Sequence, residues 1–114
     1  MMLLRSWDLN MDIIKYKVII TPTAYREMDR IYEYIAEVLF AKDAAKRLMQ
    51  QVEEKIKKLE ISPKIYEEVE KFDELKKRYR KIVIENFIVL YTIDEENNIV
   101  YVSNMYYGKK DYLK

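Results

Sequence analysis

Residues 78–107 read RYRKIVIENFIVLYTIDEENNIVYVSNMYY, and this stretch decides the fold. Three runs rich in β-branched and aromatic residues, at 78–84, 87–93 and 98–107, are typical of strands. Glu85-Asn86 separates the first two runs, and the acidic and amide-rich segment 94–98 separates the last two. Both separators are typical of hairpin turns. Consecutive strands with such short connections predict a three-stranded antiparallel meander.

The chain before the meander predicts one strand and a pair of helices. The run KYKVII at 15–20 is typical of a short strand, which Thr21-Pro22 ends. Thr21 or Thr23 can cap a helix over 23–40, since proline is tolerated in a first helical turn. A second helix is predicted over 44–60 with Asp43 as its N-cap. Because the connection is so short, the two helices must fold back as an antiparallel hairpin.

Each predicted helix carries one apolar stripe, at spacings of three and four residues. The stripes consist of Met28, Ile31, Ile35 and Leu39 in the first helix and of Leu48, Val52, Ile56 and Leu59 in the second. We expect both stripes to pack on one face of the sheet. The predicted fold class is therefore α+β: an N-terminal strand, an antiparallel helical hairpin, then a three-strand antiparallel meander. Ser62-Pro63 ends the second helix, and the charged residues 64–77 predict a loop that can include a helical turn.

The composition bounds the chemistry. With 114 residues, half of them hydrophobic and 36% charged, the chain predicts a single globular domain, which we place at 15–114 after an N-terminal extension over 1–14. The absence of cysteine excludes disulfides, thiol catalysis and cysteine zinc sites, and favours the cytoplasm. The absence of histidine removes the commonest general base and metal ligand. We expect no cofactor and no metal site, and the apolar run MMLL near the start is too short to span a membrane.

Positive charge gathers at the first strand of the meander and at the end of the chain. The segment KKRYRK at 76–81 holds five cations in six residues, and YYGKKDY at 106–112 joins tyrosines to a lysine pair. If the strands run up, down and up, the start of the first and the end of the third lie at opposite ends of the sheet. The two basic clusters therefore do not meet through strand pairing alone, although each is a candidate surface for a polyanion.

The ordered set of these segments resembles the RelE/ParE superfamily, the toxins of bacterial type II toxin–antitoxin modules, which are often called plasmid stabilisation proteins. The resemblance covers about residues 15–113, and its most specific part is YRKIVIENFIVLYTIDEENNIVYVSNMYYGKKDY at 79–112. It implies a growth-inhibiting toxin that a small cognate antitoxin neutralises by wrapping around it. It also implies two alternative targets. RelE-like members cut mRNA in the ribosomal A site, and ParE-like members bind DNA gyrase and stall it.

The resemblance carries over to particular residues. As an mRNA interferase, a ribosome-dependent endoribonuclease, the chain would use Arg80, Lys81, Lys109 and Tyr107 as catalytic residues. Arg78, Lys76, Lys77, Lys110 and Tyr112 would bind RNA or another target. Two positions depart from the pattern of mRNA-cleaving members, in which arginine is common at the position of Ile88 and histidine at that of Tyr107.

The residues leave three functions open. Ribonuclease action needs a base, an acid and charge stabilisation at one phosphate, which cations and tyrosines would supply here. Gyrase inhibition needs only a binding surface. The third alternative is an inactive member or a plain interaction module, in which each cation is an ordinary solvated surface charge. A homodimer and a heterotetramer with the antitoxin are both compatible with the sequence.

Overall fold

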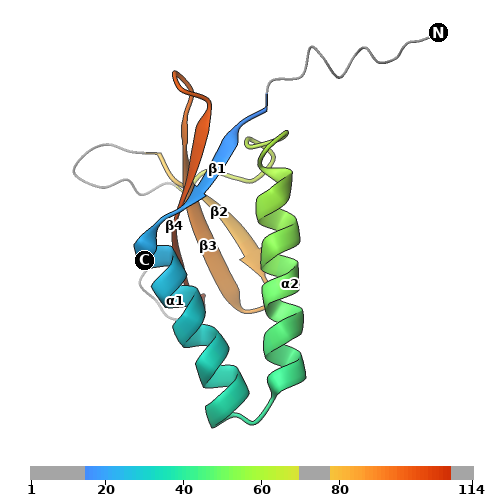
Figure 1. Ribbon diagram of the computed structural model, residues 1–114. Coiled ribbons are helices and arrows are strands. Elements are labelled where there is room, and N and C mark those ends of the chain that lie inside the picture. Colours follow the sequence, from blue (N-terminus) through green and yellow to red (C-terminus); the bar gives the residue numbers. More distant parts are fainter. Residues whose placement is uncertain (1–14, 70–77, 109–114) are drawn as a thin grey trace, which may run out of the picture.

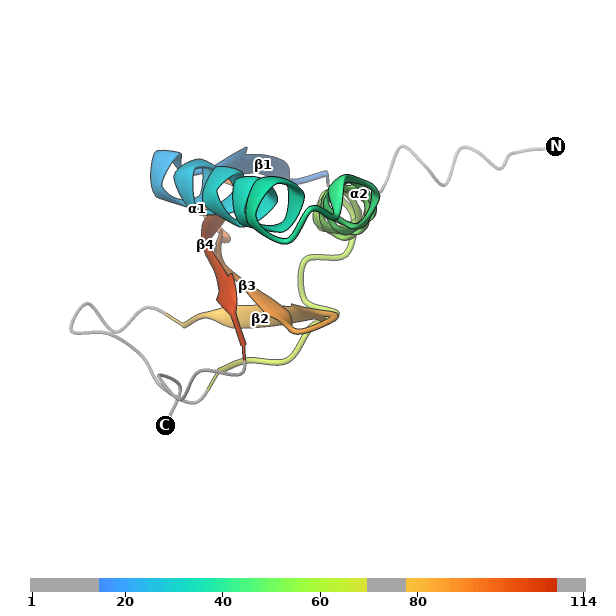
Figure 2. The same cartoon turned by 90° about the horizontal axis from the view of Figure 1, so that it is seen from below.

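The computed structural model of the chain describes residues 15–69 and 78–108. The predicted extension over 1–14 lies outside the described residues, and so do the candidate residues Lys76, Lys77, Lys109, Lys110 and Tyr112. The described chain forms a four-stranded sheet, and two antiparallel helices lie side by side over one of its faces (Figures 1 and 2). The predicted α+β fold is therefore confirmed.

The elements follow the predicted order along the chain. They are β1 (Lys17–Ile20), α1 (Pro22–Glu33), η2 (Tyr34–Val38), α2 (Lys42–Lys58), β2 (Arg80–Ile84), β3 (Phe87–Asp94) and β4 (Ile99–Tyr107). In space the strand order is β1-β4-β3-β2. The antiparallel pairs β2–β3 and β3–β4 are the predicted meander. The sequence did not place β1, which lies parallel to β4 at the edge of the sheet.

The helical hairpin begins as predicted but turns earlier. The Thr21 hydroxyl accepts a hydrogen bond from the Ala24 N–H at 3.1 Å and caps α1. The predicted single helix over 23–40 is wrong in its second half, where the chain passes into one π-helical turn, η2, and leaves the helix after Val38. The predicted cap at Asp43 is also wrong, because α2 begins at Lys42 with Ala41 as its N-cap. Asp43 lies in the first turn instead, where the helix dipole favours a carboxylate.

The core lies between the helices and the inner face of the sheet. In α2 the predicted stripe is fully confirmed, since all four of its side chains are buried. In β2 the alternation of two holds, because Ile82 and Ile84 are buried whereas Val83 between them is exposed; in β3 the consecutive residues Ile88 and Val89 are both buried. The largest fully buried side chains are Tyr91, Leu48, Leu59, Ile82, Ile84, Met105, Val89, Val100 and Val102. A shift in the β3–β4 register between Leu90 and Tyr91 leaves Ser103 as an extra residue in β4.

A short segment after α2 covers the outer edge of β2. Glu68 forms an antiparallel bridge with Arg80, the Val69 N–H donates to the Tyr79 carbonyl at 2.8 Å, and the Lys81 N–H donates to the Glu67 carbonyl at 3.1 Å. The sequence predicts a loop over 64–77 that can include a helical turn. Within the described part of that range, residues 67–69 are extended and protect an edge strand from open pairing.

Candidate functional site

The basic start of β2 is bound to the segment that follows α2. The Arg80 guanidinium donates from Nη1 to the carbonyl oxygens of Tyr66 at 2.7 Å and Lys64 at 3.3 Å, and from Nη2 to the Glu68 carboxylate at 3.2 Å. Its side chain is only 18% exposed. Because a guanidinium satisfies several carbonyl groups at fixed angles, Arg80 acts as a clamp that holds residues 64–68 against the sheet.

The other described cations of this cluster also have acidic neighbours. Lys81 Nζ lies 3.6 Å from Glu67 Oε2, and Arg78 Nη1 lies 3.6 Å from Glu68 Oε1. The Arg78 side chain is largely exposed, so its ion pair is screened by water. Glu67 and Glu68 thus neutralise part of the positive charge at the start of β2. This weakens the attraction that the cluster would have for a phosphate.

Tyr91, which is buried beside Arg80, also holds the segment that follows α2. Its hydroxyl donates to the Pro63 carbonyl at 2.5 Å, and its ring meets the Tyr66 ring edge-on at 6.5 Å between centroids. Tyr91 is fully buried, and burial raises the pKa of its hydroxyl to about 12 although Arg80 opposes the shift. The neutral hydroxyl is therefore a structural donor at physiological pH.

Tyr107 lies at the other end of the sheet. Strand pairing sets Arg80 beside Tyr91, whereas Tyr107 pairs with Phe87, which in turn pairs with Ile84. Four residues of strand separate the Arg80–Tyr91 pair from the row of Ile84, Phe87 and Tyr107. At the rise of a β-strand this is roughly 13 Å. The prediction that the start of the first meander strand and the end of the third lie at opposite ends of the sheet is confirmed. The structure brings Arg80 and Lys81 together as strand neighbours, but it does not bring them to Tyr107.

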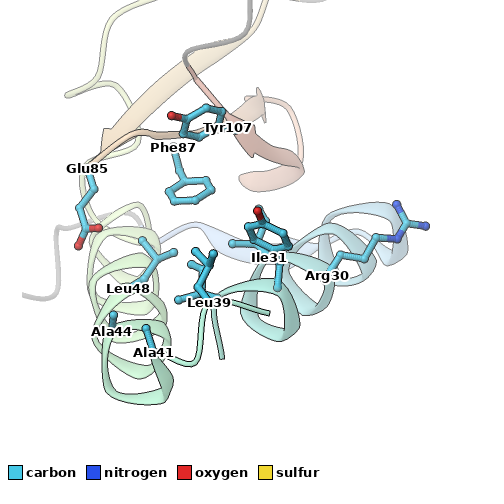
Figure 3. Close-up of a pocket in the computed structure, with 11 residues that line it drawn as sticks. Arg30, Ile31, Leu39, Ala41, Ala44, Leu48, Glu85, Phe87 and Tyr107 are labelled. Carbon is cyan, nitrogen blue, oxygen red and sulfur yellow. The ribbon is translucent and has the colours of Figure 1, made fainter. Parts of the chain in front are cut away.

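An apolar groove opens beside Tyr107. It has a volume of about 780 Å³ and lies between the hairpin and the end of the sheet where the β2–β3 turn meets β4 (Figure 3). Its lining side chains are Arg30, Ile31, Tyr34, Ile35, Leu39, Ala41, Ala44, Leu48, Glu85, Phe87 and Tyr107. The Phe87 and Tyr107 rings contact each other edge-on, with centroids 5.7 Å apart. A concave, mostly apolar surface of this volume with a charged side chain at either side is typical of a binding site, so we take this groove as the candidate site.

The tip of the helical hairpin adds exposed apolar side chains at the edge of the groove. Leu39 is 53% exposed, and Phe40, its neighbour, is 89% exposed. The expectation that Leu39 continues the core stripe of the first helix is therefore wrong. The sheet ends before it reaches Leu39, so that this side chain lines the groove instead. The sequence signal for this surface is Leu39-Phe40, two large apolar residues at a helix break where turn residues are normally small or polar.

Metal-ligating residues and apolar helices bear on other possible functions. No group of three or more histidine, cysteine, aspartate or glutamate side chains is arranged to hold a metal ion among residues 15–69 and 78–108. Over the same residues, no helix is long and apolar enough to cross a membrane.

Comparison with known proteins identifies the family. The model of the ParE toxin of the type II toxin–antitoxin system parDE matches residues 18–112. A search of curated proteins gave no significant match. Among solved structures, a chain of the chromosomal ParDE system from P. aeruginosa is similar with a TM-score of 0.63 and 17% sequence identity, covering 82% of this chain and 96% of that one.

A chain of the RelBE2 toxin–antitoxin complex from Mycobacterium tuberculosis is similar with a TM-score of 0.54 and 20% identity, covering 82% of this chain and 92% of that one. At these identities the solved structures establish a shared fold, and the family match establishes the relationship. The chain therefore belongs to the ParE toxin family of type II toxin–antitoxin systems, within the RelE/ParE superfamily that its sequence resembles.

Proposed function

We propose that this toxin inhibits growth by binding DNA gyrase, without cutting mRNA, and that a cognate antitoxin protein neutralises it. The match to the ParE family over residues 18–112 supports the ParE-like branch. Both the target and the antitoxin act in the bacterial cytoplasm, which agrees with the absence of cysteine from the chain.

The placement of Arg80 carries the choice of mechanism. Ribonuclease action would require Arg80 and Tyr107 to act on one phosphate, since base, acid and charge stabilisation must lie within hydrogen-bond reach of the reacting atoms. Strand register sets the two residues roughly 13 Å apart along the sheet. The Arg80 guanidinium is also occupied by two carbonyl groups and one carboxylate of residues 64–68. This arrangement supports a structural role for Arg80 in place of a catalytic one.

A binding function agrees with the surface of the molecule. A target protein is held by apolar side chains in a concave site with a polar rim, and the groove beside Phe87 and Tyr107 has this character. An antitoxin is proposed on the ground that both solved relatives come from toxin–antitoxin systems, ParDE and RelBE2. A segment that folds on binding could cover such an apolar surface.

Two assays on the same purified chain test the proposal. The first measures ATP-dependent supercoiling of relaxed plasmid by gyrase, and the second measures ribosome-dependent mRNA cleavage by primer extension in a cell-free translation reaction. We expect inhibited supercoiling, intact mRNA and restoration of gyrase activity by the antitoxin. The matched variants are Lys109→Ala and Arg78→Ala, both of which should retain gyrase inhibition.

The alternatives give different results in the same assays. New mRNA ends that need ribosomes and disappear in Lys109→Ala would establish RelE-like cleavage and overturn the proposal. Unaffected gyrase together with intact mRNA would favour an inactive member or a plain interaction module.

A further inference from the structure

The turn between β2 and β3 contains a residue in an uncommon backbone conformation. Ile84 pairs with Phe87, so the turn consists of Glu85 and Asn86. The φ of Glu85 is 55°, in the left-handed region that normally favours glycine or asparagine. Its carboxylate accepts a hydrogen bond of 2.6 Å from Gln51 Nε2 on α2. Strained backbone persists where its surroundings hold it, and here the strained residue ties the turn to the helix.

The other side of the turn is bound to the end of β4. The N–H of Gly108, the only glycine in the chain, donates to the Asn86 carbonyl at 2.6 Å. A Cβ atom at position 108 would lie 2.9 Å from Ile88 Cγ1 and 3.3 Å from the Asn86 carbonyl oxygen, so a neighbour would have to move. Glycine therefore allows the end of β4 to approach the turn closely. We call this bond and the Gln51–Glu85 bond the turn bonds.

The turn bonds lie next to the aromatic wall of the groove. Phe87 directly follows the turn, Tyr107 is the last residue of β4, and their rings are in edge-on contact. Both rings line the groove together with Glu85 (Figure 3). Leu48, which lies on α2 about one helical turn before Gln51, lines it from the helix side. The turn bonds therefore fix where the two rings lie relative to α2.

We infer that Gln51, Glu85 and Gly108 are positioning residues for binding at the groove. Through the turn bonds they hold the Phe87 and Tyr107 rings as an ordered wall before a partner arrives. A partner that meets an ordered wall loses less free energy to the ordering of side chains and loops. Where the turn is closed in only a fraction of the chains, the apparent dissociation constant rises in inverse proportion to that fraction.

The inference rests on the proposed function, because gyrase is the partner whose binding is measured. The turn bonds themselves belong to the free chain and can be followed without gyrase. The exchange of the Gly108 amide hydrogen with solvent reports on its bond to the Asn86 carbonyl, since a hydrogen-bonded amide exchanges only when the local structure opens. Toxin potency against gyrase and amide exchange in the free chain therefore test the inference separately.

A swap of the two bonded side chains is the main test. Gln51→Glu sets two carboxylates against each other, and we expect it to weaken gyrase inhibition and to speed exchange of the Gly108 amide, each about three- to tenfold. The double variant Gln51→Glu with Glu85→Gln restores an amide donor and a carboxylate acceptor with their positions exchanged. It should return both values to within about twofold of the natural chain. The matched control is Gln50→Ala, an exposed neighbour on α2, which should change neither value.

Gly108→Ala tests the second turn bond from the side of β4. The added methyl group pushes the end of β4 away from Ile88 and Asn86, so gyrase inhibition should weaken at least as much as in Gln51→Glu. The swap at positions 51 and 85 should not rescue this variant, because the Gln51–Glu85 bond is intact in it. Cooperative thermal unfolding followed by circular dichroism verifies that each variant is folded.

Three results would overturn the inference. Unchanged exchange of the Gly108 amide in Gln51→Glu would show that the turn does not depend on this bond. Faster exchange with undiminished gyrase inhibition would show that the ordered wall does not serve binding. A double variant that regains slow exchange but not inhibition would assign Glu85 to direct contact with the partner. If the natural chain leaves gyrase unaffected, the proposed function fails, and amide exchange in the free chain still supports or overturns the role of the turn bonds in ordering the wall.

Discussion

One end of the helix–sheet interface is covered by a segment of the chain, and the other end is open. At the start of β2, residues 61–69 fold back over the sheet, and Arg80 and Tyr91 bind their carbonyl groups. At the opposite end, no described segment crosses the space between Phe87 and the hairpin tip, and a groove remains. The helices are similar in apolar pattern, yet Leu59 is fully buried while Leu39 is half exposed. Burial of an apolar stripe therefore depends on what lies opposite it as much as on its periodicity.

In the proposed function, the covered end has a structural role and the open end binds a partner. At the covered end, polar groups find partners within the chain, which leaves little free capacity for a ligand. At the open end, apolar side chains stay in water, where a partner can gain free energy by covering them. The described cations of the basic cluster, Arg78, Arg80 and Lys81, lie at the covered end.

The largest effect is expected when the clamp at the covered end is removed. Arg80→Ala leaves the Tyr66 and Lys64 carbonyl groups without their donor and should lower the free energy of unfolding by about 2–3 kcal/mol. Arg78→Ala removes a cation from the same cluster but only an exposed ion pair, so its effect should stay below about 0.5 kcal/mol. Urea unfolding followed by circular dichroism measures both. Equal, small effects would remove Arg80 from the structural role assigned to it.

A smaller effect, with a pH signature, is expected for Tyr91→Phe. Loss of the hydrogen bond to Pro63 should cost about 1–2 kcal/mol at neutral pH. Burial raises the pKa of Tyr91 from 10.0 to about 12, so its neutral form is favoured in the folded state. The stabilisation is complete below about pH 10 and declines as the pH rises towards 12, by up to about 1.4 kcal/mol per pH unit.

The difference in unfolding free energy between the natural chain and Tyr91→Phe should therefore shrink from pH 9 to 11. Tyr25→Phe, at an exposed position, serves as the control and should give a difference that stays near zero over the same range. A pH-independent difference for Tyr91→Phe would mean that the hydroxyl titrates alike in the folded and unfolded chains.

The smallest effect has the opposite sign and belongs to the open end. Phe40→Gly should raise the free energy of unfolding by about 0.5–1 kcal/mol, because glycine accepts the left-handed backbone that phenylalanine strains. Tyr25→Gly, in right-handed helix, should lower it by about 1 kcal/mol. Thermal unfolding followed by circular dichroism measures both changes. A destabilised Phe40→Gly chain would show that the ring packs within its own molecule.

The sequence predicts what depends on local pattern. The meander, the helical hairpin, a threonine cap at Thr21 or Thr23 and the buried stripe of the second helix follow from spacing and turn chemistry. The structure has all of them, with Thr21 as the cap. The up, down, up order also predicts that Arg80 and Tyr107 lie apart, which the strand register confirms.

The sequence does not predict what depends on distant coverage. The π-helical turn, the open groove and the exposure of Leu39 arise where the sheet ends beneath the helices, which periodicity does not encode. The same holds for the extended pairing of residues 67–69 with β2, which places carbonyl groups and Glu68 within reach of Arg80. The sequence of a basic strand start is the same whether its cations bind a phosphate or a loop of the same chain.

The measurement that tests the central claim most directly is gyrase supercoiling titrated with the full chain and with its Lys109→Ala, Lys110→Ala double variant. We expect both to inhibit supercoiling with similar potency and to be reversed by the antitoxin, because the proposed action is to bind a protein and needs no cleavage of a phosphodiester. Undisturbed supercoiling at toxin concentrations that stop translation in a cell-free reaction would contradict the account.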